Sequence, residues 1–136
     1  MAPDTSDAYT TLKKSRALMR ARTRGNELFQ KGDLKGACSA YTEGLGADPG
    51  NAVLLCNRAA TLSKLGKWKE ALRDCQLALD NHPRYTKAMK RRAQCYLKVR
   101  QGSDTWREGE QRVEVDRGVW GSRYTLALLY LVLLNY

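Results

Sequence analysis

The stretch that decides the fold is "LMRARTRGNELFQKGDLKGACSAYTEGLGADPGN", residues 18–51, because the following 34 residues repeat its pattern. Residues 52–85 read "AVLLCNRAATLSKLGKWKEALRDCQLALDNHPRY". Aligned without a gap, the two segments share seven identities: Arg24/Arg58, Leu28/Leu62, Gly32/Gly66, Lys35/Lys69, Ala37/Ala71, Leu45/Leu79 and Pro49/Pro83. A single period of 34 residues explains all seven identities, so the chain contains an internal repeat.

Each repeat predicts two helices. A first amphipathic stretch ends at a glycine-containing turn, "KGD" at 31–33 or "LGK" at 65–67. A second amphipathic stretch ends at a proline-containing turn, "DPGN" at 48–51 or "HPRY" at 82–85, where His82 is a turn residue. Apolar residues at helical spacing between such turns predict an all-α fold of helix-turn-helix units.

A helix pair of this length and punctuation resembles the tetratricopeptide repeat. The resemblance implies a right-handed solenoid with small residues where helices approach closely and larger packing residues opposite them. The small residues are Gly25, Ala59, Ala93, Ala37 and Ala71, and the larger ones are Tyr41 and Cys75.

The resemblance covers residues 16–100, about two and a half repeats. We expect a disordered segment at 1–15, a repeat domain at 16–100 and a divergent tail at 101–136. The domain consists of repeats at 18–51 and 52–85 and the first helix of a third at 86–99.

The third unit keeps the register only through its first helix, at Met89, Ala93 and Tyr96. The small, packing and closing positions of its second helix hold Thr105, Gly109 and Arg117 instead. The tail ends in an apolar run, Leu126 to Leu134, which is too short for the roughly 20 residues of a membrane-spanning helix. We expect this run to pack against the fifth helix, with weak membrane-surface contact as a further possibility.

The net charge is +10, and all of the excess lies in residues 1–100. Nucleic acid is one class of partner for such a surface. However, the sequence shows no aromatic-bearing sheet, recognition helix or phosphate-binding loop. Specific nucleic-acid binding is therefore not the preferred interpretation.

Positive charge is concentrated in "YTKAMKRRAQCYLKVR", residues 85–100. At 100° per residue, Lys87 and Arg91 fall on the face opposite Ala93 and Tyr96. In stacked repeats the first helix of each unit lines a concave groove, so this charged face is expected to line it. Lys90, Arg92 and Arg100 lie off this face and are interpreted as solvated.

Matching groove positions in the earlier repeats are Arg22, Asn26 and Asn57. Together with Lys87 and Arg91 they resemble the two-carboxylate clamp of co-chaperone tetratricopeptide domains. The resemblance implies binding of the free C-terminal Glu-Glu-Val-Asp tail of 70 and 90 kDa heat-shock chaperones. The pattern departs at one position, where Arg22 replaces a lysine and presents a planar fork instead of a compact ammonium group. Ala60 and Lys64 are possible additional groove contacts.

The residue types suit this ligand. A terminal aspartate carries two carboxylates, which require several fixed cations, and asparagine amides donate hydrogen bonds without adding charge. A scaffold for another acidic partner, or a nucleic-acid surface, remains the alternative.

No catalytic, metal or cofactor site is predicted. His82 is the only histidine, and the chain lacks a Cys-x-x-Cys pair, a phosphate-binding glycine loop and clustered carboxylates. The four cysteines, Cys38, Cys56, Cys75 and Cys95, are interpreted as reduced, packed thiols. The absence of a leader sequence predicts a cytoplasmic protein.

Among clamp-bearing families, "RTRGNELFQKGDLKGACSAYTEGL" and "LCNRAATLSKLGKW" most resemble the plant tetratricopeptide thioredoxin-like proteins, followed by the chaperone-organising proteins. The plant proteins carry further repeats and a thioredoxin-like domain. The resemblance therefore suggests a fragment, a truncated product or a read-through product, and no thioredoxin activity is carried over.

Overall fold

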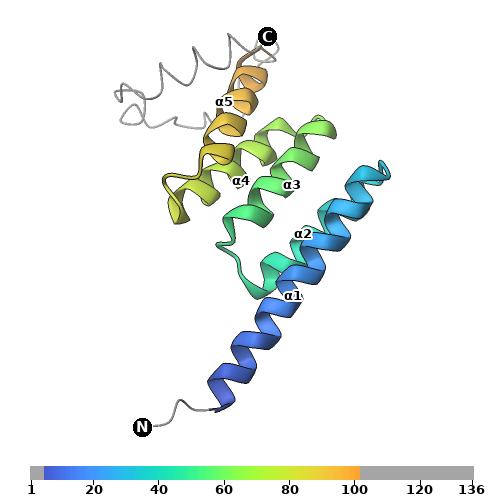
Figure 1. Cartoon of the computed structure of the whole chain (residues 1–136). Coiled ribbons are helices and arrows are strands. Elements are labelled where there is room, and N and C mark those ends of the chain that lie inside the picture. The colour runs from blue at the N-terminus through green and yellow to red at the C-terminus, as the bar shows by residue number, and fades with distance from the viewer. Residues whose placement is uncertain (1–4, 102–136) are drawn as a thin grey trace, which may run out of the picture.

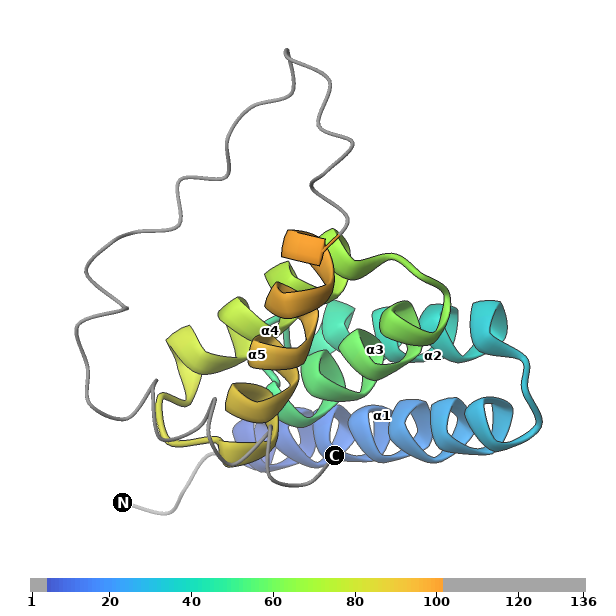
Figure 2. The same cartoon turned by 90° about the horizontal axis from the view of Figure 1, so that it is seen from above.

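The computed structural model describes residues 5–101, which form five α-helices and no strand. The helices are α1 (Thr5–Gln30), α2 (Leu34–Ala47), α3 (Ala52–Lys64), α4 (Trp68–Asn81) and α5 (Thr86–Gln101). The two pairs α1/α2 and α3/α4 are antiparallel hairpins that lie side by side, with α5 next to α4 (Figures 1 and 2). The main contacts join helices that are consecutive in the sequence, and α3 also contacts α5. This is the all-α repeat architecture that the sequence predicts.

The turn inside each hairpin depends on one glycine. Gly32 has φ +82° and Gly66 has φ +76°, in the left-handed region that residues with a Cβ rarely adopt. The following helix of the first hairpin is capped by Asp33, whose Oδ1 accepts from the backbone N–H of Gly36 at 2.9 Å. The repeated glycine therefore marks the α1–α2 and α3–α4 turns.

The turns between hairpins follow the predicted prolines. α2 and α4 end at Asp48 and His82, whose backbone N–H groups donate to the carbonyls four residues earlier. Pro49 and Pro83 come next and cannot continue the helical hydrogen bonds. Asn51 then begins α3 by accepting from the N–H of Leu54 at 3.1 Å.

The core consists of two clusters of buried residues. The first core cluster joins α1, α2 and α3 around Tyr41, which is 2% exposed, and the second joins α3, α4 and α5 around Cys75, which is 0% exposed. A Cβ at Gly25 would collide with the Tyr41 ring, which explains the small residue there. The equivalent Ala59 is also completely buried. The predicted close approach of the helices is confirmed in both complete repeats.

The prediction for the buried face of α5 needs correction. The fully buried residues of α5 are Ala88 and Cys95, whereas Met89, Ala93 and Tyr96 are half-buried. Packing against α3 and α4 of the preceding repeat selects this face. The face expected from the sequence is the one that, in the two complete repeats, packs against the second helix of the same hairpin.

The expected disorder of residues 1–15 is wrong for residues 5–15, because α1 already begins at Thr5. These residues contain neither proline nor glycine, and extending an existing helix costs far less than nucleating one. Figure 1 shows the resulting extension of α1 beyond α2. Lys14 forms an ion pair with Asp48, with Nζ and Oδ1 3.9 Å apart, near the end of α2.

Residues 1–4 and 102–136 lie outside the described part of the chain. The predictions for the divergent tail, including its apolar run, fall there. Among the helices of residues 5–101, none has both the length and the apolar character that a bilayer crossing requires.

Candidate functional site

The candidate site begins with two asparagines on neighbouring first helices, Asn26 of α1 and Asn57 of α3. The Nδ2 of Asn57 donates to Oδ1 of Asn26 at 3.3 Å, and the hydroxyl of Tyr41 donates to the same oxygen at 2.7 Å. Because Oδ1 of Asn26 already accepts two hydrogen bonds, the group that Asn26 can offer to a ligand is its N–H₂ donor. The structure thus links two of the predicted clamp residues.

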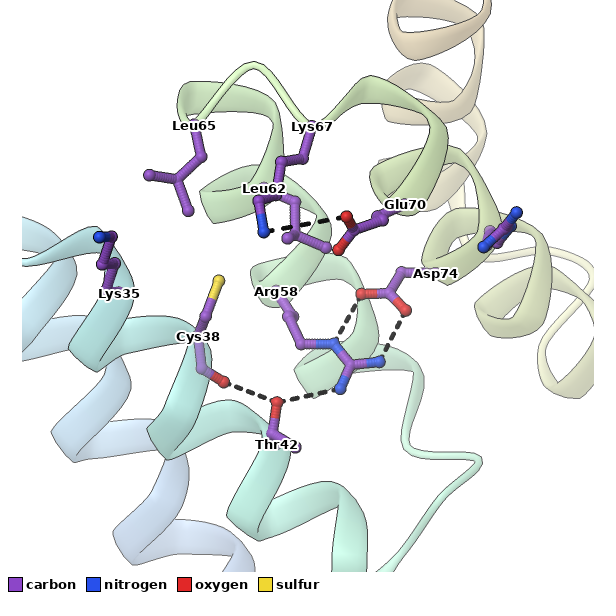
Figure 3. Close-up of a pocket in the computed structure, with 10 residues that line it drawn as sticks. Lys35, Cys38, Thr42, Arg58, Leu62, Leu65, Lys67, Glu70 and Asp74 are labelled. Atoms are coloured by element: carbon purple, nitrogen blue, oxygen red, sulfur yellow. Dashed lines mark hydrogen bonds and ion pairs between the residues drawn. The ribbon is translucent and has the colours of Figure 1, made fainter. Parts of the chain in front are cut away.

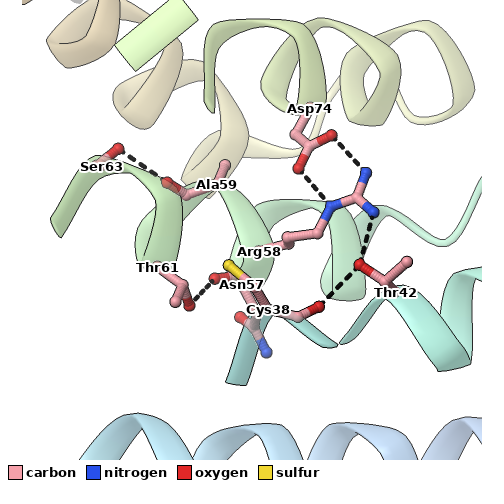
Figure 4. Close-up of polar contacts among 8 residues, drawn as sticks. All are labelled: Cys38, Thr42, Asn57, Arg58, Ala59, Thr61, Ser63 and Asp74. Atoms are coloured by element: carbon pink, nitrogen blue, oxygen red, sulfur yellow. Dashed lines mark hydrogen bonds and ion pairs between the residues drawn. The ribbon is translucent and has the colours of Figure 1, made fainter. Parts of the chain in front are cut away.

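The direction of Asn57 separates two sides of α3. Its side chain points toward α1, whereas the next residue, Arg58, points toward Asp74 of α4 and Thr42 of α2 (Figure 4). Adjacent residues of a helix are about 100° apart around its axis, so they serve different surfaces. Asn57 faces the surface formed by the first helices of the repeats.

Arg22 and Arg91 come from opposite ends of the domain and act on the same side chain. Burial raises the pKa of Tyr85, the thiol of Cys56 adds to the increase, and the charges of Arg22 and Arg91 oppose it. Tyr85 therefore lies within electrostatic reach of both guanidinium groups. The structure brings these two predicted clamp cations to one region.

The three predicted clamp cations have no acidic partner within residues 5–101. Arg22 and Lys87 are exposed and Arg91 is half-buried. The ion pairs in this part of the chain use Lys14, Arg24, Arg58 and Lys67 instead. Positive charge therefore remains available where the clamp was predicted.

Arg91 carries the clearest sign of an unfilled site. Its Nε is buried and has no hydrogen-bond partner among the described residues. Buried donors are normally paired, so such a group requires an explanation, and a missing anionic ligand is one. This N–H is available to a carboxylate oxygen.

The additional groove residues are placed less directly. Lys64 is exposed, and its Nζ lies 4.4 Å from the centroid of the Phe29 ring, which is a cation–π contact between α3 and α1. Ala60 is half-buried, one helical turn before Lys64. Lys64 thus lies beside α1, but it is engaged by an aromatic ring, and no contact of Ala60 singles it out.

Three known proteins resemble the chain closely. It is 47% identical over 85 residues to the inactive TPR repeat-containing thioredoxin TTL3 of Arabidopsis thaliana, covering 62% of this chain and 12% of that protein. The first TPR of Spaghetti (RPAP3) bound to the HSP90 peptide SRMEEVD matches with TM-score 0.62 and 34% identity, covering 66% of this chain and 71% of that chain. The TPR2B domain of yeast Sti1 in complex with an Hsp70 peptide matches with TM-score 0.61 and 35% identity, covering 65% and 71%.

The chain belongs to the tetratricopeptide repeat family. No family model matches it, but the two solved domains share more than 30% identity, and the chain covers more than two thirds of each. The chain spans only 12% of the curated relative TTL3.

A second surface of this tetratricopeptide repeat domain is a hollow of about 450 Å³ between α2, α3 and α4. Arg58 crosses it, donating from Nε and Nη2 to the two carboxylate oxygens of Asp74, both at 2.7 Å, and from Nη1 to Thr42 at 3.0 Å (Figure 3). The hydrogen bond to Asp74 is the main cause of the raised pKa of Arg58. None of the predicted clamp residues lines this hollow, and its central charges are paired, so we interpret it as structural.

Sequence reasoning missed the polar role of Tyr41. It was assigned as a packing residue, and its ring does pack against Gly25, but its hydroxyl also orients Asn26. A buried tyrosine normally needs a hydrogen-bond partner, and this could have pointed to Asn26. Phe29 and Tyr85 were also missed, and their contacts depend on helix packing that a single repeat does not reveal.

Proposed function

We propose that the domain binds the free acidic C-terminus of heat-shock chaperones of the 70 and 90 kDa classes. The proposed two-carboxylate clamp consists of Arg22, Asn26, Asn57, Lys87 and Arg91. The domain would act as a binding adaptor in a co-chaperone, with no catalytic step of its own. The proposal retains the cytoplasmic location expected from the sequence.

The observation that carries the proposal is the pairing of Asn26 with Asn57. It positions amide donors between the exposed Arg22 on one side and the unpaired Nε of Arg91 on the other. Two similar solved domains are described as bound to HSP90 and Hsp70 peptides, which supports a ligand of this class.

The chemistry of the ligand explains the division of roles. The main-chain and side-chain carboxylates of a terminal aspartate need charged donors, which Lys87 and Arg91 of α5 and Arg22 of α1 would supply. The asparagines would donate to oxygens near the chain end without introducing an unbalanced charge. A guanidinium forms two parallel hydrogen bonds to a carboxylate, so Arg22 would hold its oxygen atoms in one plane.

The decisive experiment compares two peptides that end in Met-Glu-Glu-Val-Asp, one with a free C-terminus and one amidated. Amidation removes a single carboxylate and leaves the rest of the peptide unchanged. We expect it to weaken binding by on the order of 2 kcal/mol, about 30-fold in Kd, because charged donors lose their acceptor. Equal affinities in isothermal titration calorimetry would contradict the clamp and favour a scaffold for a different acidic partner.

The nucleic-acid alternative is based on the net charge of +10. Binding to DNA or RNA through charge alone weakens steeply as salt increases, because counterions are released. We expect only such weak binding from this domain. Tight, sequence-selective binding to an oligonucleotide at physiological salt would favour the alternative instead.

A further inference from the structure

Two buried thiols meet where α4 contacts α5. Cys75 and Cys95 are both 0% exposed and belong to the second core cluster. Their thiols are hydrogen-bonded to one another. The Oγ of Ser63 on α3 lies 3.4 Å from Sγ of Cys95, so a hydroxyl also contacts this pair.

The surroundings make the two thiols unequal. The hydrogen bond from Cys75, together with the Ser63 hydroxyl and the charge of Arg91, lowers the pKa of Cys95 to about 7 against the opposing effect of burial. The same hydrogen bond and burial raise the pKa of Cys75. Cys95 is therefore suited to attack as a thiolate, while Cys75 keeps its proton until a second step.

Access to this pair depends on α5. Within residues 5–101 this helix is the last, and its only fully buried residues are Ala88 and Cys95. A helix with so few buried residues opens locally at a lower free energy than the whole domain unfolds. Such opening would admit a small oxidant to Cys95.

We propose that Cys75 and Cys95 form a disulfide between α4 and α5 when the protein meets a hydroperoxide. The Cys95 thiolate attacks a peroxide oxygen, the O–O bond breaks, and the departing hydroxide or alkoxide is protonated to water or alcohol. Cys75 then attacks the sulfur of the Cys95 sulfenic acid. The S–O bond breaks as the S–S bond forms, and the released hydroxide takes the Cys75 proton as water. Two thiols are thus oxidised and one peroxide is reduced.

The disulfide would lie directly behind the proposed peptide site. Arg91 precedes Cys95 by one helical turn, and its charge acts on both thiols. The proposal itself goes beyond peptide binding, because disulfide formation can be measured with no peptide present. It therefore remains testable whether or not the clamp is correct.

The test treats the reduced full chain with equimolar hydrogen peroxide, blocks the remaining thiols with iodoacetamide and maps tryptic peptides by mass spectrometry. We expect a disulfide-linked pair consisting of "DCQLALDNHPR" (74–84) and "AQCYLK" (93–98), with Cys38 and Cys56 recovered alkylated. The oxidised chain should remain monomeric on a non-reducing gel. Recovery of all four cysteines as alkylated thiols, or disulfides that mainly involve Cys38, would overturn the proposal.

The order of the steps is tested with the serine variants and dimedone, which labels sulfenic acids. In Cys75→Ser the second step is blocked, so Cys95 should retain the dimedone label. In Cys95→Ser, Cys75 should remain unlabelled, because it lacks the attacking thiolate. The reverse pattern would overturn the assigned roles, and the mapping of the wild-type chain does not depend on the stability of either variant.

Discussion

Arg91 and Lys87 are the residues on which the proposed peptide site depends most directly. We expect Arg91→Ala or Lys87→Ala to weaken binding of a free-acid Glu-Glu-Val-Asp peptide by about 2 kcal/mol, because a ligand carboxylate loses its charged donor. Fluorescence anisotropy with a labelled peptide measures the change. Circular dichroism at the same time checks that the helices are intact.

Lys90 provides a matched control on the same helix. It is exposed, carries the same charge and was assigned to the solvated face. Lys90→Ala should therefore change the affinity by less than a factor of two. Equal losses for Lys87, Lys90 and Arg91 would indicate diffuse attraction by a basic surface and would contradict a clamp.

The ion pair between Arg58 and Asp74 makes a prediction about stability. Asp74 is 7% exposed, so Arg58→Ala leaves a nearly buried carboxylate without its two donors. We expect a loss of about 3 kcal/mol in the free energy of unfolding, as is typical for breaking a buried pair from one side. Urea denaturation measures this loss.

Two comparisons strengthen the ion-pair test. The exposed neighbour in Arg73→Ala should cost less than about 0.5 kcal/mol. The double variant Arg58→Met/Asp74→Leu should recover part of the loss, because no charge remains buried. A double variant as unstable as the sum of both single substitutions would show that the hydrogen-bonded pair itself is indispensable.

At the level of single residues, the register of the repeat was sufficient to select the candidate site residues. The two asparagines occupy equivalent helices, and the structure joins them. The partners of Asn26 were not predictable in the same way, because Tyr41 reaches it across a hairpin. Such a contact depends on the rotation of one helix against the other, which no local pattern specifies.

At the level of elements, the packing of α1 against α2 depends on one missing side chain. Gly25→Ala would place a Cβ against the Tyr41 ring, and this ring is 2% exposed and held by its hydroxyl bond to Asn26. We expect a loss of about 1–3 kcal/mol in stability, typical of overpacking. Thermal unfolding followed by circular dichroism measures it.

Gly46 is the matched control in α2, where an added Cβ would meet no atom within 4 Å. Gly46→Ala should stabilise the domain by about 0.5 kcal/mol, because alanine loses less backbone freedom on folding. If Gly25→Ala were equally stabilising, the close approach of α1 and α2 would not be a constraint.

The sequence could predict the helices and their turns because glycine and proline recur at a fixed period. It was wrong about the start of α1, since composition alone does not show that a packed helix can be extended cheaply beyond its partner. It was also wrong about the buried face of α5. There the apolar pattern records a partner helix from the same hairpin, whereas the described burial arises from the preceding one.

At the level of the whole molecule, the tail makes the remaining prediction. We expect the apolar run Leu126–Leu134 to cover the half-buried face of α5, which carries Ala93, because about three repeats are usually needed for a stable stack. Deleting residues 124–136 should then lower the unfolding midpoint by several degrees, since 1 kcal/mol corresponds to about 4–8 °C in a domain of this size. An unchanged or higher midpoint with better solubility would show that the run covers nothing.

The contacts between consecutive helices also determine how the domain responds to mechanical force. Apart from α3 with α5, the main contacts in the described residues join each helix to the next one in the chain. Tension applied at the two ends is therefore not shared by many parallel strands or long-range pairs but acts on one interface at a time. Helices should peel away successively from either end at low force, and release of tension should allow them to re-form in short, local steps.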